Sequence, residues 1–225
     1  TQVINLHRRA VAPGVVEQQV QPPKGRLHPF EKRGKFYARL AGHTSATLGD
    51  VPSGESVRIA GMVSSVRVLT IKQGRNAGLK MAKFLLEDLD GMVPITCFAR
   101  TYGEVKDDIV EDSIVFVEGR LEREGEETAM LLDSLRTAQS IVNAEVSALV
   151  LRLEQADASR QQAIDRIKRL ASAHKGDQRL MLEITDGDET WRIRTSPRFS
   201  VRLTDELLDG FADLLGASSL AFTRT

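Results

Sequence analysis

The chain has few of the residues that mark several common classes of protein. It contains one cysteine, Cys97, which excludes an intrachain disulfide framework and any cysteine-rich zinc site. Its four histidines lie far apart in the sequence, so we expect no metal site and no cofactor. No apolar run approaches the roughly 20 residues that span a bilayer. A reducing, cytoplasmic setting is the compartment that this composition favours.

Signals for catalysis are also missing. The glycine-rich phosphate loop of nucleotide-binding enzymes does not occur. Acidic pairs such as Asp107-Asp108 are expected at a helix end, where carboxylates are normally solvated. Cys97 lies in an apolar run without a histidine near it, which favours core packing over nucleophilic chemistry. We therefore expect no catalytic residue in this chain.

The charge is balanced overall but not along the chain. There are 31 basic and 31 acidic residues, so net charge gives no reason to expect nucleic acid as a partner. One stretch differs, because residues 67–83 contain five cations and no acid. These cations are Arg67, Lys72, Arg75, Lys80 and Lys83. A local cluster of this kind can bind phosphates and release their counterions.

The hydrophobic pattern predicts a β-barrel over residues 55–140. Residues 55–67 alternate between apolar and polar, with Gly61 placed where a strand must bend. Asp90-Gly91 is typical of a tight hairpin. Strands are expected at residues 80–87, 92–98, 113–120 and 130–135, with a short helix at 100–109. Three strands, a helix and two strands is the order of a Greek-key OB barrel, a fold that often holds oligonucleotides.

A chain of 225 residues needs more than one such barrel. We expect an extended arm or linker at residues 1–27, a helical lead-in at 28–54, and a second domain at 141–225. The second domain reads as βαβββαβ, which is an α+β fold with helices on one face of a mixed sheet. Its fourth strand is expected at residues 199–203.

The five cations of residues 67–83 are the expected nucleic-acid site, together with Phe84 and Phe98 as stacking candidates. Two simpler interpretations remain open: the cations belong to a solvated loop, and both phenylalanines fill the core. The turn at residues 122–127 carries four glutamates, which would repel a phosphate backbone there. Binding is therefore expected on one side of the barrel.

The last domain has a second candidate surface. Trp191 is followed by four arginines whose spacing suggests one face of adjacent strands: Arg192, Arg194, Arg198 and Arg202. Tryptophan and arginine are enriched at the centres of protein interfaces, so this band is a candidate docking surface for an acidic partner. A solvated sheet face is the alternative.

Several motifs resemble the C-terminal region of the bacterial DNA polymerase III alpha subunit. They are Val57-Arg-Ile-Ala-Gly-Met-Val-Ser-Ser-Val-Arg67, Leu86-Glu-Asp-Leu-Asp-Gly91, Val117-Glu-Gly-Arg120 and, upstream, His28-Pro29. The resemblance implies an OB domain and a C-terminal domain that binds the clamp loader's tau subunit. The polymerase's palm and its metal-dependent phosphoesterase domain have no counterpart in this sequence.

Two functional classes follow from these observations. The first is a non-catalytic part of a replicative polymerase, whose barrel holds single-stranded template DNA and whose last domain docks tau. The second is an independent single-stranded DNA- or RNA-binding OB protein. The chain begins with Thr1 rather than methionine, which is consistent with a fragment of a longer protein.

Overall fold

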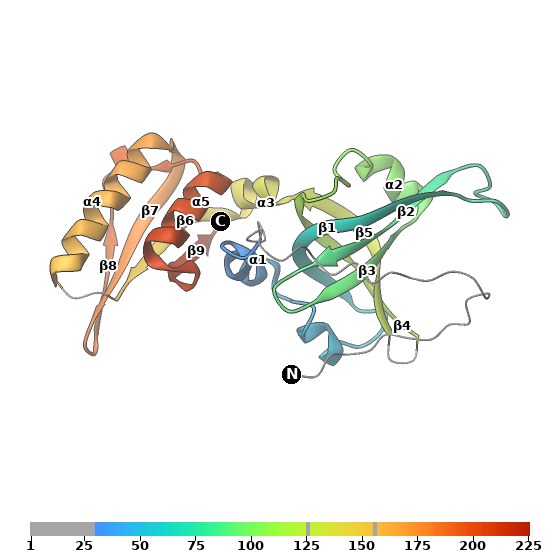
Figure 1. Cartoon of the computed structure of the whole chain (residues 1–225), viewed down its shortest axis with the longest axis horizontal. Helices are drawn as coiled ribbons and strands as arrows, with labels where there is room; N and C mark the ends of the chain where they lie inside the picture. The colour runs from blue at the N-terminus through green and yellow to red at the C-terminus, as the bar shows by residue number, and fades with distance from the viewer. Residues whose placement is uncertain (1–29, 125–126, 155–156) are drawn as a thin grey trace, which may run out of the picture.

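A computed structural model describes residues 30–124, 127–154 and 157–225 of the chain. It shows a barrel and a second unit built on a four-stranded sheet, with two short helices between them (Figure 1). The predicted arm at residues 1–27 and the His28-Pro29 pair lie outside the described residues. No helix in the described ranges is long and apolar enough to cross a membrane.

The first unit is the closed five-stranded barrel that the sequence predicts. Its strands follow one another in space as β1-β2-β3-β5-β4, and β4 pairs with β1 to close the barrel. All pairs are antiparallel except β3 with β5. The elements are β1 (Ser56–Thr70), β2 (Lys80–Glu87), β3 (Met92–Cys97), α2 (Ala99–Val105), β4 (Ile114–Glu124) and β5 (Glu127–Thr137).

Strand β1 bends at the two places that its sequence marks. A Cβ atom on Gly61 would lie 2.7 Å from the carbonyl oxygen of Glu87, so only glycine allows this close approach of β2. The pairing with β2 then shifts between Ser64 and Arg67, where Ser65 has a φ of 53°. This bulge turns the far end of β1 and carries it beyond the barrel.

The barrel core is filled by alternating residues of each strand. Ala82, Phe84 and Leu86 of β2 are buried, as are Val93, Ile95 and Cys97 of β3. The residues between them face outward, as the period of a β-strand requires. The alternate residues of β1, β2 and β3 therefore form an outer face, and these residues take no part in filling the barrel core.

The second unit has the predicted α+β class. Its mixed sheet has the order β8-β7-β6-β9, in which β6 and β7 are parallel. Leu149, Leu182 and Phe211 belong to the core that the sheet forms with its helices. The elements are α3 (Ala138–Glu145), β6 (Val146–Leu153), α4 (Asp157–Ala173), β7 (Lys175–Asp186), β8 (Glu189–Arg194), α5 (Asp205–Leu215) and β9 (Leu220–Arg224).

One predicted strand of this unit is wrong. Residues 199–203 do not form a strand, because a 3₁₀ turn (Pro197–Phe199) begins the segment and Val201 makes only isolated bridges. Proline at the first position of the turn fixes φ in the helical range and has no N–H to give to a sheet. The helix that follows is as predicted: Thr204 accepts a hydrogen bond from the Leu207 N–H at its start.

Helix α1 (Gly34–Ala41) precedes the barrel in sequence but lies between the two units (Figure 1). Tyr37 packs edge-on against Phe116 of the barrel, with ring centroids 5.8 Å apart. Phe36 packs edge-on against Phe222 of β9 at 5.3 Å. The helix and both units therefore share one hydrophobic core.

Charged side chains reinforce this junction. Arg58 of β1 donates to both carboxylate oxygens of Glu145, at 2.6 and 2.9 Å, and to the carbonyl oxygen of Leu40 at 2.7 Å. Arg224 reaches the same two residues from β9, at 3.3 and 2.9 Å. Because the guanidinium of Arg58 holds the charged form in place, the pKa of Glu145 is lowered.

A second set of ion pairs joins the start of α1 to α5. Arg33, which is 5% exposed, pairs with Asp205 and with Asp209, the latter at 2.9 Å. The hydroxyl of Tyr37 donates to Asp205 at 3.0 Å. These contacts fix the lead-in helix against the last helix of the chain.

Candidate nucleic-acid interface

The far ends of β1 and β2 form a hairpin that projects from the barrel (Figure 1). Its loop, residues 71–79, is closed by hydrogen bonds between Ile71 and the Gly78-Leu79 pair, at 2.8 and 2.9 Å. Gly74 and Gly78 have φ values of 87° and 85°, which side chains rarely adopt. The two glycines therefore allow the loop to turn. Residues 72–80 are all exposed.

Two of the predicted cations stand directly opposite each other. Arg67 of β1 pairs in register with Lys83 of β2, and Lys83 pairs with Thr96 of β3. Partners in such a row point to the same face of the sheet. Both cations are exposed, and neither forms an ion pair within the described residues. Like charges in this position repel each other, so a bound anion would stabilise the pair.

Apolar side chains flank this cationic row. Leu69 and Met81 form the next row toward the hairpin tip, and Leu85 and Pro94 form the row behind it. Phe98 follows the buried Cys97, so alternation places it on the outer side near Met81, and it is 51% exposed. The outer face thus combines cations with apolar and aromatic surface, which single-strand binding requires.

The remaining cations are more dispersed than the sequence predicts. Lys80 pairs with Thr70, two residues before the buried Ala82, and so lies on the opposite face of the hairpin from Lys83. Lys72 and Arg75 lie in the exposed loop. The cation cluster is therefore a pair on the outer face with three further charges around the hairpin.

The two aromatic candidates have different positions. Phe84 is 2% exposed and packs in the barrel core, so the prediction that it contacts nucleic acid is wrong. Its neighbours Ala82 and Leu86 share the same inward parity, which already favours burial. Phe98 is exposed and remains a candidate.

The outer face also includes residues that the sequence reasoning passed over. Leu69, Met81 and Leu85 are neither cationic nor aromatic, so residue type alone does not mark them as contact residues. Met81 and Leu85 alternate with the buried Ala82, Phe84 and Leu86, so the period of a strand already places them on the outer side of β2. Several apolar side chains gathered on one face carry more information than a single exposed one.

An acidic group borders the face at the base of the hairpin. A carboxylate oxygen of Glu111 accepts a hydrogen bond from the Val66 N–H at 2.7 Å, at the base of the hairpin. Glu122 is exposed at the end of β4, next to a turn that includes residues 125–126, which lie outside the described ranges. The favourable surface for an anion is therefore confined to the hairpin and the row behind it.

Chemical reactivity is not evident at this face. Cys97 is fully buried, and burial raises the pKa of its thiol to about 11, which suppresses the thiolate. Across the part of the chain that the structure describes, no cluster of three or more metal-ligating side chains occurs. The described face therefore combines exposed cations with apolar surface, and its one thiol is buried.

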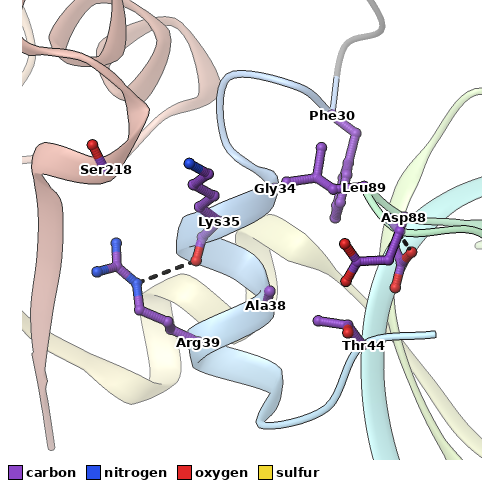
Figure 2. Close-up of a pocket in the computed structure, with 10 residues that line it drawn as sticks. Phe30, Gly34, Lys35, Ala38, Arg39, Thr44, Asp88, Leu89 and Ser218 are labelled. Carbon is purple, nitrogen blue, oxygen red and sulfur yellow. Dashed lines mark hydrogen bonds between the residues drawn. The ribbon is translucent and has the colours of Figure 1, made fainter. Parts of the chain in front are cut away.

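A cavity of about 420 Å³ lies away from this face, at the junction of the two units (Figure 2). Phe30, Gly34 and Arg39 form one wall, and Asp88 and Leu89 of the β2–β3 turn form another. Its lining is mostly apolar carbon. The cavity is a gap in the packing around α1, separate from the cationic row.

The second candidate surface, in the last domain, is divided between two faces. Trp191 pairs with the buried Ile184, while Arg192 pairs with Glu183 on the other face of the sheet. The prediction of a single arginine face is wrong for Arg198 and Arg202, since residues 199–203 are not a strand. Arg194 lies on the face of Arg192, and the guanidinium of Arg198 stacks on Phe199 at 4.8 Å.

Comparison with known families identifies the barrel. A family model described as "OB-fold nucleic acid binding domain" matches residues 57–138. The barrel is an OB-fold domain. Its strand order and its hairpin agree with that assignment, and the face described above lies on β1, β2 and β3 of the OB domain.

The chain is similar to the DNA polymerase III alpha subunit, which confirms the resemblance seen in the sequence. It is 28% identical over 176 residues to the subunit of Mycobacterium tuberculosis, covering 76% of this chain. It is 26% identical over 201 residues to that of Neisseria meningitidis serogroup B, covering 86%. The match spans only 14% and 16% of the length of these relatives.

Two solved structures each resemble about two fifths of the chain. The SSB domain of a Synechococcus sp. protein has a TM-score of 0.32 and 14% identity, covering 38% of this chain and 98% of that one. The second OB-fold domain of replication protein A from Methanococcus maripaludis has a TM-score of 0.31 and 11% identity, covering 40% and 91%. At these TM-scores the superpositions support no statement about function.

Proposed function

We propose that this chain is a non-catalytic part of a bacterial replicative DNA polymerase of the DNA polymerase III alpha type. In this proposal, the OB domain binds single-stranded template DNA along the outer face of β1, β2 and β3. The second unit docks the clamp-loader tau subunit. The similarity to alpha subunits over most of the chain supports the assignment to a replication complex.

The observation that carries the DNA-binding role is the Arg67–Lys83 pair. Two cations held opposite each other, with no acid in residues 67–83, are stabilised when a phosphate lies between them. Leu69, Met81 and Phe98 lie beside the pair and can contact unpaired bases, which a duplex keeps stacked inside. This surface therefore favours single strands over duplex DNA.

The docking role of the second unit is assigned to its outermost strand. Its outermost strand, β8, is exposed along its whole length and carries Trp191 next to Arg192. The resemblance to the alpha subunit suggests tau as the partner. Binding of purified tau to the chain, measured by calorimetry, tests this half of the proposal, and an absence of binding would leave the DNA-binding half standing.

The DNA-binding half is tested by titrating labelled oligo(dT) with the chain at several salt concentrations. Each phosphate contact contributes about 0.7 to the slope of log K against log salt for single strands. Substituting both Arg67→Gln and Lys83→Gln should reduce the magnitude of that slope by about 1.4 and weaken binding at low salt. A parallel titration with duplex DNA measures the preference for single strands over duplex. A parallel titration with oligo(rU) measures the preference for DNA over RNA.

A matched control removes the same charge elsewhere. Arg166→Gln with Arg169→Gln neutralises two exposed cations on α4, in the other unit. This control should leave the slope close to that of the unaltered chain. If the control and the Arg67/Lys83 variant gave the same slope, the proposed face would not be the binding surface.

A further inference from the structure

Strand β8 is an edge strand that the described part of the chain leaves uncovered. It stands at one end of the sheet order β8-β7-β6-β9, and all six of its residues are exposed. Figure 1 shows β8 beside β7, with the β7–β8 turn projecting from the second unit. An uncovered edge offers unpaired backbone N–H and C=O groups to another strand.

The outward-pointing backbone groups can be assigned. The Thr195 N–H donates to the carbonyl oxygen of Leu180 at 3.3 Å, so Thr195 faces β7. Backbone groups in an antiparallel pair alternate between the two sides of the strand. Ile193 and Trp191 therefore also bond toward β7, and the N–H and C=O groups of Arg192 and Arg194 point to the free edge.

The side chains of β8 alternate in the other direction, between the two faces of the sheet. Trp191 and Ile193 lie on the face of the buried Ile184 and Leu182, but they remain 46% and 43% exposed. Protected edges normally carry charge at such positions. At this free edge, two large apolar side chains stand where a protected edge would carry charge. Both side chains are accessible to a partner.

Beside these apolar side chains the second unit has a cavity of about 240 Å³. It lies between β7 and α4, where Leu180 and Leu182 face Ile164 and Ile167, and Thr195 borders it directly after β8. An apolar side chain from a strand paired with β8 would pack on Trp191 and Ile193, on the same face of the sheet as this cavity. The helix-covered face of the edge is therefore suited to apolar residues.

The open face of the same edge is positively charged. Glu183 is shared by Arg152 and Arg192, at 2.8 and 2.7 Å, and it is the acid at the centre of this face. Arg194 and Arg179 lie on the same face and form no ion pair within the described residues. A partner strand would meet uncompensated positive charge on this side.

We propose that β8 accepts an extended strand from a protein partner, in which acidic residues alternate with apolar ones. The acidic side chains lie over Arg192 and Arg194, and the apolar side chains pack on Trp191 and Ile193. Backbone hydrogen bonds supply the affinity, and the two faces supply the specificity. The inference rests on the proposed docking role of the second unit and defines its surface.

Trp191 is the single tryptophan of the chain, so its fluorescence reports on β8 directly. The probe is a synthetic peptide of about eight residues, long enough for a six-residue strand, with alternating glutamate and valine. Its addition to the whole chain should shift the emission of Trp191 to shorter wavelength in a saturable way. A peptide of the same composition with its glutamates and valines in two blocks should bind more weakly by about tenfold or more.

Backbone pairing is tested by modifying the peptide. The protein itself is unchanged, so a loss of binding cannot result from misfolding. N-methylation of every second residue removes the donors on one edge of the peptide strand. Methylation of one alternate set should abolish binding, and methylation of the other set should leave it within about twofold. The acidic set is the sensitive one if the strands are antiparallel. Equal effects of the two methylations would overturn the inference, as would an unchanged emission spectrum.

Charge complementarity is tested on the protein. Arg194→Glu should weaken the glutamate–valine peptide by about tenfold and favour a lysine–valine peptide instead. Arg166→Glu, on the exposed side of α4, is the matched control. If tau bound the unaltered chain and the Arg194→Glu variant equally, the docking role would stand and the β8 edge would be excluded. If the peptides behaved as expected and tau did not bind, the edge would stand and tau would be the wrong partner.

Discussion

The junction between the two units should lose a measurable part of its stability when Glu145 is neutralised. Glu145→Gln keeps the shape of the side chain and removes the charge that Arg58 and Arg224 share. Arg58 would keep its hydrogen bond to the Leu40 carbonyl oxygen and lose a two-point carboxylate partner. The perturbation is thus confined to one side of a charge-assisted contact.

The magnitude follows from burial and geometry. Removing one partner of a fully buried pair costs about 3–5 kcal/mol. The side chains of Arg58 and Glu145 are 17% and 24% exposed, so water replaces part of what is lost. We expect a loss of about 2 kcal/mol, which corresponds to a decrease of about 4–8 °C in Tm for a chain of this length.

A double-mutant cycle measured by urea unfolding and thermal melting isolates the pair. Arg58→Met, Glu145→Gln and the double variant should show a coupling of about 1.5 kcal/mol, because removing the second partner costs little once the first is gone. Arg120→Met, which removes an exposed β4 cation, serves as the control and should change stability by less than about 0.5 kcal/mol.

The pH dependence gives a second check on the same pair. The pKa of Glu145 lies below its usual value of 4.5, mainly because Arg58 hydrogen bonds to its carboxylate. A group with a lowered folded-state pKa contributes stability above its unfolded pKa and loses it as the pH falls through the folded one. The difference between the unaltered chain and Glu145→Gln should therefore be full at pH 7 and shrink below about pH 4. Identical melting at pH 7, or a difference that does not shrink as the pH is lowered below 4, would refute this reasoning.

Three further outcomes follow from individual residues. Phe98→Ala should weaken oligo(dT) binding by about 1–3 kcal/mol if the ring stacks on a base, and an unchanged affinity would exclude Phe98 from the interface. Gly61→Ala should destabilise the fold by about 1–3 kcal/mol in urea unfolding, since its Cβ would lie 2.7 Å from the Glu87 carbonyl oxygen, and equal stability would show that the strands can separate. Cys97 should react slowly with a thiol reagent at pH 8 in the folded chain and quickly in urea, because it is buried and its pKa is raised to about 11; rapid labelling of the folded chain would contradict that burial.

The barrel could be predicted because its signals are local. Alternation along β2, the bend at Gly61 and the turn at Asp90-Gly91 each restrict the backbone over a few residues, and the structure satisfies all three together. The second domain's sheet could be predicted for the same reason. The strand predicted at residues 199–203 was wrong because an alternating pattern alone does not reveal that Pro197 begins a 3₁₀ turn.

The candidate site was harder to predict because it depends on register. Five cations close together in sequence suggest one patch, but a strand alternates its faces, so Lys80 and Lys83 point to opposite sides. The pairing of Arg67 with Lys83 depends on the bulge that follows Ser64, and a shift of one residue would separate them. The strand register that decides which cations share a face cannot be read from composition or from a count of charges.

The place of α1 has a mechanical consequence. The polypeptide passes between the two units twice, once as α1 on its way into the barrel and once as α3 on its way out (Figure 1). Two crossings and a shared core resist twisting in a way that one flexible linker cannot. The molecule should accordingly be stiff along its length, so that the barrel and the second unit keep a constant spacing.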